Sequence, residues 1–193
     1  MIRLPCLILS HDFTERVRDD TWKLLIAVMF LNKTNGRVAV PMFWEVLRRW
    51  PNAILLSIAD EEELTTLIRP LGLQAARAAR LIKLSKLFIN EPPSPNILHC
   101  SRAKIDALSY PPTPISHFPG CGAYALDSYR IFHVGPCNGP SEWKSVMPGD
   151  KELIRYLRWK WAFEQNKIWE PTAGVVGSVN EEYLRALPGL LRE

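Results

Sequence analysis

A short glycine-containing stretch at residues 118–124 has the composition best suited to chemistry in this chain. It reads Phe-Pro-Gly-Cys-Gly-Ala-Tyr, and an apolar residue followed by Pro-Gly-x-Gly and a helix-forming run is typical of a helix-hairpin-helix. The glycines allow a tight turn that brings backbone N–H groups close to an external anion, usually a DNA phosphate. An ordinary helix–helix turn is the alternative interpretation. The residues expected to hold a DNA backbone are Phe118, Gly120, Cys121, Gly122 and Ala123.

One carboxylate, Asp150, stands at the start of a strongly periodic helix pattern. Its simplest interpretation is a helix N-cap, because Met147-Pro148-Gly149 precedes it. An ionised carboxylate at a helix N-terminus can also stabilise a sugar cation or orient a water molecule. Breaking an N-glycosidic bond builds positive charge on the sugar and therefore needs such a group. Together with the phosphate-binding hairpin, Asp150 suggests an enzyme that works on DNA.

Four basic residues recur every three positions in the helix pattern over residues 74–90. The simpler interpretation is the solvated face of an amphipathic helix, and the alternative is a stripe that faces DNA phosphates. The sequence leaves both open. The four residues are Arg77, Arg80, Lys83 and Lys86.

The composition is that of a soluble globular protein. The chain has 193 residues, 47% apolar and 23% charged, which is enough for one substantial domain or two small lobes. Its net charge of +4 permits nucleic-acid binding without proving it. Residues 1–9 are apolar but too short for a signal peptide, and no apolar run approaches the roughly 20 residues of a membrane span.

The cysteines and histidines show no metal-binding pattern. Cys6, Cys100, Cys121 and Cys137 contain no CxxC pair, which excludes the usual zinc ribbons and the tight cysteine runs of iron–sulfur clusters. We expect free thiols in a reducing compartment. No metal site is predicted.

Helix periodicity dominates the chain and predicts an all-α fold. The 22–32 segment is apolar on nearly all sides, so it should be a central buried helix capped by Asp20 or Thr21. Residues 115–118 should form the first helix of the hairpin, and residues 174–179 should be flexible. Further helices are predicted over 41–50, 60–68, 74–90, 101–108, 124–132, 150–169 and 181–191, with a surface loop at 135–140.

Several segments, in order, resemble the glycosylase domain of the methyl-CpG-binding-domain thymine DNA glycosylases, in the helix-hairpin-helix superfamily that includes endonuclease III. The resemblance covers residues 12 to 165, roughly, and its most specific part is the Asp-Ser-Tyr-Arg-Ile-Phe string at 127–132. The methyl-CpG-binding domain itself is absent from this sequence. The other similar segments are 20–27, 30–34, 70–73, 122–126, 143–144 and 148–153.

The resemblance implies a two-lobed, all-α helix-hairpin-helix DNA glycosylase fold with DNA across the cleft. Residues 1–193 would form a single glycosylase domain. Residues 20–110 would mainly form the helical-bundle lobe, and residues 1–19 and 111–193 would mainly form the lobe with the hairpin and the catalytic aspartate. No cofactor or iron–sulfur cluster is expected, although a monovalent cation at the hairpin would be compatible with the family.

The resemblance also assigns roles to four residues. Asp150 matches the catalytic aspartate, and Tyr124 stands where bifunctional relatives have a lysine nucleophile. Because tyrosine cannot form a Schiff base, we expect a glycosylase without a lyase step, with Tyr124 bordering the pocket for the flipped base. Lys33 matches an arginine that fills the gap left by that base, and Leu73 matches a leucine that wedges toward the opposite strand.

Two departures from the family are informative. Lys33 keeps the positive charge of the arginine but loses its planar stacking fork. Glu152 replaces a basic residue and adds a negative charge near Asp150.

We therefore expect a monomeric, nuclear base-excision-repair enzyme that acts on double-stranded DNA and excises thymine or uracil opposite guanine. The nuclear location is inferred from the family. The alternatives are a glycosylase for another damaged base and a DNA-binding module that has lost catalysis.

Overall fold

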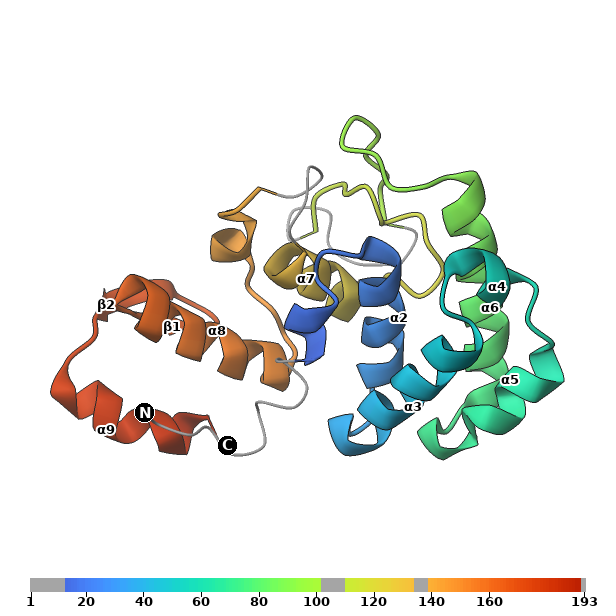
Figure 1. Cartoon of the computed structure of the whole chain (residues 1–193). Helices are drawn as coiled ribbons and strands as arrows, with labels where there is room; N and C mark the ends of the chain where they lie inside the picture. The colour runs from blue at the N-terminus through green and yellow to red at the C-terminus, as the bar shows by residue number, and fades with distance from the viewer. Residues whose placement is uncertain (1–12, 102–109, 134–138, 192–193) are drawn as a thin grey trace.

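The computed structural model describes residues 13–101, 110–133 and 139–191 and is mostly α-helical (Figure 1). This confirms the predicted all-α class, with one small antiparallel sheet that the sequence analysis did not predict. In chain order the labelled elements are α2 (Thr21–Leu31), α3 (Gly36–Arg49), α4 (Ala53–Ser57), α5 (Glu61–Leu67), the 3-10 helix η1 (Arg69–Leu71), α6 (Gln74–Asn90), α7 (Ala123–Phe132), the 3-10 helix η2 (Glu142–Ser145), α8 (Lys151–Gln165), β1 (Lys167–Glu170), β2 (Gly174–Ser178) and α9 (Glu181–Leu190).

Helix α2 is the central buried helix that its apolar sequence predicted. Trp22 and every residue from Leu24 to Phe30 are buried, because the helix contacts α3, α6 and α7 on different sides. The Asp20 side chain accepts a hydrogen bond from the Lys23 backbone N–H at 3.0 Å and so begins the helix. The indole N–H of Trp22 donates to Ser85 Oγ of α6 at 3.0 Å.

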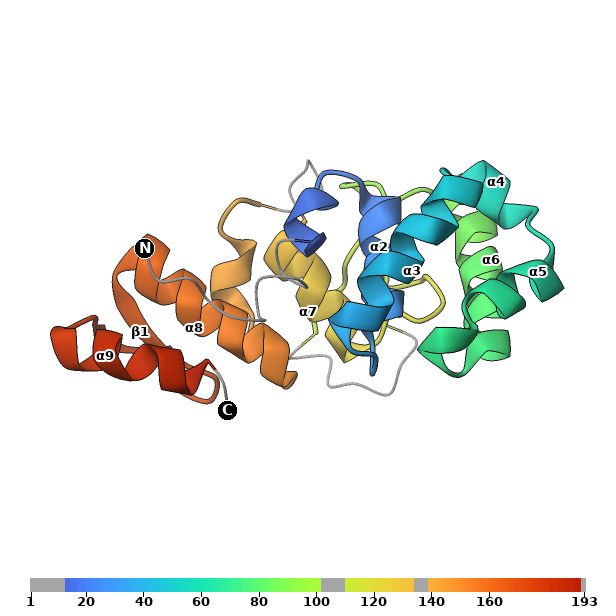
Figure 2. The ribbon, with the colours of Figure 1, turned by 60° about the horizontal axis from the view of Figure 1, so that its bottom comes forward.

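The helices from α2 to α6 lie together on one side of the molecule (Figures 1 and 2). Helix α8, the small sheet and α9 lie on the other side, with α7 between the two groups. One hydrophobic cluster includes buried residues of α2, α3, α6, α7 and α8. A second, small cluster consists of the buried residues Ala162, Leu187 and Leu191. The lobe boundaries given above remain a prediction. Among the described residues, no helix has both the length and the hydropathy for crossing a bilayer.

Two helix boundaries differ from the sequence-based expectation. Helix α3 begins at Gly36 rather than Pro41, because the Asn35 side chain accepts from the Arg37 N–H at 2.9 Å and starts the helix earlier. Helix α8 ends at Gln165, because Asn166 adopts a left-handed conformation with φ of 53°. The chain then forms β1, which pairs with β2 where a flexible segment was expected.

The first helix expected in the hairpin is also absent from the described structure. Residues 115–118 form successive turns, in which the Phe118 N–H donates to Ile115 O at 3.1 Å and the Cys121 N–H donates to Phe118 O at 3.2 Å. The helix predicted over 101–108, the loop predicted at 135–140, Cys6 and Cys137 lie wholly or almost wholly outside the described residues.

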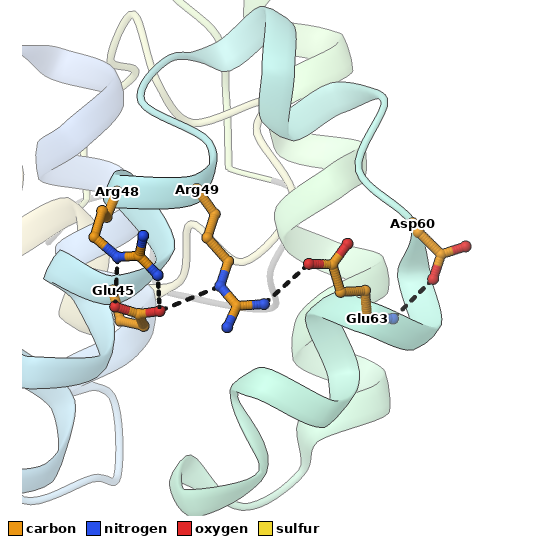
Figure 3. Close-up of polar contacts among 5 residues, drawn as sticks. All are labelled: Glu45, Arg48, Arg49, Asp60 and Glu63. Carbon is orange, nitrogen blue, oxygen red and sulfur yellow. Dashed lines mark hydrogen bonds and ion pairs between the residues drawn. The ribbon is translucent and has the colours of Figure 1, made fainter.

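A chain of ion pairs joins α3 to α5 (Figure 3). Arg49 Nη1 lies 2.9 Å from Glu63 Oε1, and its Nε lies 3.2 Å from Glu45 Oε1. Hydrogen bonding by Arg48, reinforced by Arg49, lowers the pKa of the Glu45 carboxyl to about 2. Asp60 caps α5 by accepting from the Glu63 N–H at 2.7 Å. The contacts orient α5, which leads directly into η1 and the turn that follows it.

Candidate DNA-binding and catalytic site

The hairpin buries the side chains of two of its residues in the core. Phe118 and Cys121 are buried, and the Phe118 ring stacks on Phe88 of α6 at 5.8 Å between ring centroids. Gly120 has a φ of +92°, a left-handed conformation that favours glycine. Gly122 is the N-cap of α7, and no side chain caps this helix. The first N–H groups of α7 therefore receive no side-chain cap, and their binding of an anion stays a prediction.

The thiol of Cys121 is structural rather than reactive. Burial raises the pKa of this cysteine to about 12, so the thiol stays protonated at neutral pH. Because the Phe118 and Cys121 side chains point into the core, contact of these residues with DNA would come from their backbone atoms. The DNA-binding role of the hairpin residues remains a prediction.

Asp150 caps helix α8 and is only partly exposed. Its Oδ1 accepts hydrogen bonds from the N–H groups of Glu152 at 2.9 Å and Leu153 at 3.1 Å. Neither of these two bonds uses Oδ2. The helix N-terminus favours a negative charge at this position, and the two bonds fix the orientation of the carboxylate. The N-cap interpretation is therefore confirmed, and it leaves an oxygen for chemistry.

Two residues of α7 interact electrostatically with Asp150. Burial, and then the charge of Asp150, raise the pKa of the Tyr124 phenol. Asp127, one turn further along α7, is only 3% exposed and accepts a hydrogen bond from the Tyr110 hydroxyl at 3.2 Å. Its burial raises the pKa of Asp127 to about 6, and Asp150 acts in the same direction. Tyr124 is one of the site residues expected from the sequence, whereas Asp127 is not, because nothing in its local pattern indicates burial.

Glu152 forms an ion pair with Arg155. Its Oε1 lies 2.6 Å from Arg155 Nη1, one turn along α8, so the extra negative charge noted in the sequence is partly neutralised within the same helix.

Lys33 and Leu73 lie in turns, and both have left-handed backbones. Lys33 has a φ of 58° and Leu73 a φ of 51°, a conformation that is costly for side chains other than glycine, asparagine and aspartate. Leu73 exposes 73% of its surface. Thr34 Oγ1 lies 3.4 Å from Leu71 O, which brings the two turns together. The wedge and gap-filling roles themselves remain predictions.

The four basic residues of α6 do not share one face. Arg80, Lys83 and Lys86 are exposed, but Arg77 is buried, so the expectation of a single solvated or phosphate-facing stripe is wrong for Arg77. Arg77 lies four residues before the buried Leu81, a spacing that places it on the core face of the helix. The stem of Arg80 lies over the hairpin: a Cβ built on Gly120 would come within 3.0 Å of Arg80 Cδ.

Within the described ranges, no cluster of three or more His, Cys, Asp or Glu residues is arranged to hold a metal ion. The expectation of a monovalent cation at the hairpin stays a prediction.

The curated relatives of the chain include two proteins named as glycosylases and one methyl-CpG-binding domain protein 4-like protein. A thymine-DNA glycosylase of Aeropyrum pernix is 37% identical over 148 residues, covering 77% of this chain and 57% of the relative. A methyl-CpG-binding domain protein 4-like protein of Arabidopsis thaliana is 31% identical over 154 residues, covering 80% of this chain and 28% of the relative. A thymine/uracil-DNA glycosylase of Pyrobaculum aerophilum is 32% identical over 126 residues, covering 65% and 50%. The chain thus spans between 28% and 57% of the length of these relatives.

No protein-family model matches the chain. Among solved structures, a thermostable thymine-DNA glycosylase is similar over 65% of this chain and 56% of its own, with 17% identity and a TM-score of 0.47. The sequence relatives are the stronger finding, because their identity extends over most of this chain. The chain is therefore a homologue of the thymine-DNA glycosylases and resembles the glycosylase domain of the methyl-CpG-binding-domain thymine DNA glycosylases.

Proposed function

We propose that the chain is a DNA glycosylase that removes thymine or uracil paired with guanine. The observation that carries the proposal is the position of Asp150. Its Oδ1 is held by two backbone N–H groups of α8, and its charge acts on Tyr124, two residues beyond the uncapped hairpin glycine of α7. A fixed carboxylate beside an anion-binding turn is suited to glycosidic bond cleavage on a DNA strand held by its phosphates.

In the proposed reaction the hairpin N–H groups bind a phosphate, and the target nucleotide rotates out of the duplex. Lys33 and Leu73 occupy the gap and offset part of the cost of flipping, a few kcal/mol. Asp150 stabilises the positive charge that develops on the sugar as the base departs, and a water molecule completes the hydrolysis. Tyr124 borders the base and cannot form a Schiff base, so the product is an abasic site in an uncut strand.

Single-turnover base release tests this proposal. Duplexes with G·T, G·U, A·T and A·U pairs are incubated with the protein and then treated with hot alkali. We expect strand breaks only after alkali, and mainly from the guanine-paired substrates. Breaks before alkali would contradict the absence of a lyase step, and release of neither base from any duplex would contradict the glycosylase activity on thymine and uracil.

A further inference from the structure

The guanidinium of Arg77 is buried in the first turn of α6. The residue is only 8% exposed, and burial, together with the charge of Arg80, lowers the pKa of its guanidinium. A positive charge is also unfavourable near a helix N-terminus. The described residues surround this group with carbonyl and hydroxyl oxygens rather than with a carboxylate. A buried charge without a paired carboxylate is costly unless hydrogen bonds replace its lost hydration.

The hydrogen bonds of Arg77 connect the two turns that carry Lys33 and Leu73. On the α6 side, its Nε donates to the carbonyl of Gly72 at 3.0 Å, directly before Leu73. On the α2 side, Nη2 donates to Asn32 O at 2.9 Å and to Thr34 Oγ1 at 2.8 Å, one on each side of Lys33. Nη1 donates to the Met29 carbonyl at 2.5 Å. One side chain thus holds the neighbours of both left-handed residues.

Two of the acceptors on the α2 side, Met29 O and Asn32 O, are carbonyls at the end of that helix. Helix α2 ends at Leu31, and the last carbonyls of a helix have no partner within it. Met29 O is one of these, and Asn32 is the C-cap. The C-terminal end of a helix also carries partial negative charge, which a guanidinium neutralises. Arg77 therefore satisfies the end of α2 and fixes the turn that leaves it.

The conformations of Lys33 and Leu73 require such support. A left-handed backbone at a residue with a long side chain persists only where the surrounding structure determines it. Leu73 is the N-cap of α6 without a side-chain cap hydrogen bond, and its own exposed side chain contributes little packing. The carbonyl before it, from Gly72, is held by Arg77.

We infer that Arg77 is a positioning residue that presets the Lys33 and Leu73 turns for entry into the gap left by a flipped base. This inference rests on the proposed function. Arginine suits the position better than lysine, because its planar group presents five donors in a fixed fork, whereas lysine offers three donors at one point. Arg77 itself contacts no DNA in this proposal and acts through the two turns.

The test compares uracil paired with guanine in an intact duplex with uracil opposite a one-nucleotide gap, where flipping needs less assistance. The variants are Arg77→Met, Arg77→Lys and the double variant Lys33→Ala/Leu73→Ala, alone and combined with Arg77→Met. Lys83→Met, an exposed charge on the same helix, is the matched control. Thermal unfolding identifies any variant that fails to fold, and 2-aminopurine beside the uracil reports flipping separately from chemistry.

We expect Arg77→Met to slow release from the G·U duplex by roughly tenfold and to reduce the 2-aminopurine signal, with less than about a twofold change on the gapped substrate. Arg77→Lys should fold like the wild type and show an intermediate loss. In the Lys33→Ala/Leu73→Ala background, Arg77→Met should add less than about twofold, because residues acting through one another are not additive.

Equal losses on the two substrates, or an additive loss in the double-variant background, would overturn the positioning role. Full activity of Arg77→Lys and Arg77→Met in the duplex would also overturn it while leaving the proposed function intact. A wild-type protein that releases uracil from neither substrate would instead overturn the proposed function itself.

Discussion

The N-termini of α7 and α8 differ in whether a side chain caps their free backbone N–H groups. Helix α7 begins after Gly122 and receives no side-chain cap. Helix α8 begins after Asp150, whose Oδ1 accepts from two of its first N–H groups. Both helix ends carry the same partial positive charge.

The difference shows how one physical property can serve two roles. An uncapped helix end next to a glycine turn has donors left for an anion from outside, such as a phosphate. A helix end capped by aspartate instead holds an anion of its own in a fixed orientation. In the proposed enzyme the first positions the substrate and the second carries out the chemistry.

The largest effect is expected from Asp150→Asn. Asparagine caps helices about as well as aspartate, so the fold should be retained while the negative charge is lost. We expect base release to fall by at least about 100-fold with duplex binding little changed, measured by single-turnover kinetics and fluorescence anisotropy.

Asp150→Ala is the matched comparison. It should lose the same activity and, in addition, about 1 kcal/mol in the free energy of unfolding, because the cap is removed. Retention of base release by Asp150→Asn would show that the charge at the α8 N-terminus has no catalytic role.

The second prediction concerns Asp127 of α7, whose pKa is raised by burial and further by the charge of Asp150 at the α8 N-terminus. Its folded pKa is about 6 and its unfolded value about 4, so the folded state binds more protons between these values. The contribution of Asp127 to stability is therefore full below pH 4 and falls as the pH rises to 6. Relative to wild type, Asp127→Asn should gain up to about 3 kcal/mol across that window in urea unfolding.

In an Asp150→Asn background the titration of Asp127 should move to lower pH, because one of the charges that raise its pKa is gone. A stability difference between Asp127→Asn and wild type that does not vary from pH 4 to 7 would show that the pKa of Asp127 is not raised. An unchanged titration of Asp127 in the Asp150→Asn background would show that Asp150 does not contribute to the raised pKa.

The third prediction separates the two hairpin glycines. A Cβ on Gly122 would meet no protein atom within 4 Å, so Gly122→Ala should fold with a loss of at most about 1 kcal/mol. The added methyl group would occupy the space where a phosphate approaches, and we expect roughly tenfold weaker binding to any duplex.

Gly120→Ala should instead lose stability, because Gly120 has a left-handed backbone and its new Cβ would lie 3.0 Å from Arg80 Cδ. Gly189→Ala, in α9 with open space around it, is the control and should bind DNA like wild type. Unchanged binding by Gly122→Ala would mean that the α7 end does not receive the phosphate.

The smallest effect is expected from Arg80→Met beside the α7 end. The aliphatic stem of Arg80 contacts the hairpin, and the residue is exposed, so its charge can reach a phosphate held there. Loss of one phosphate contact should lower the slope of log K against log salt by about 0.9 and weaken binding a few-fold. Lys86→Met, farther along α6, should change the slope less, and equal slopes for the two variants would place Arg80 outside the interface.

Local signals in the sequence predicted much of this arrangement. Capping side chains and periodic apolar residues predicted α2, α5, α6 and α9 because these features act within a few residues of one another. Asp150 was placed correctly at the start of α8 for the same reason. The glycines of the hairpin likewise predicted the uncapped start of α7.

The features that the sequence analysis missed depend on distant segments. Arg77 is buried only because the end of α2 lies against α6, although its spacing from Leu81 was an available indication. Asp127 is buried by Tyr110 and the rest of the α7 environment, which no local pattern shows. The β1–β2 hairpin follows from the left-handed Asn166, which ends a helix whose periodicity would otherwise continue.

The exposed, left-handed Leu73 has a consequence for efforts to raise the thermal stability of this protein. A residue without a side chain would fit the same backbone with less steric conflict, so stability alone does not favour leucine here. A screen for heat-resistant variants that ignores activity would therefore tend to discard the proposed wedge. For this chain, a higher melting temperature would be a poor guide to a better glycosylase if the proposed function holds.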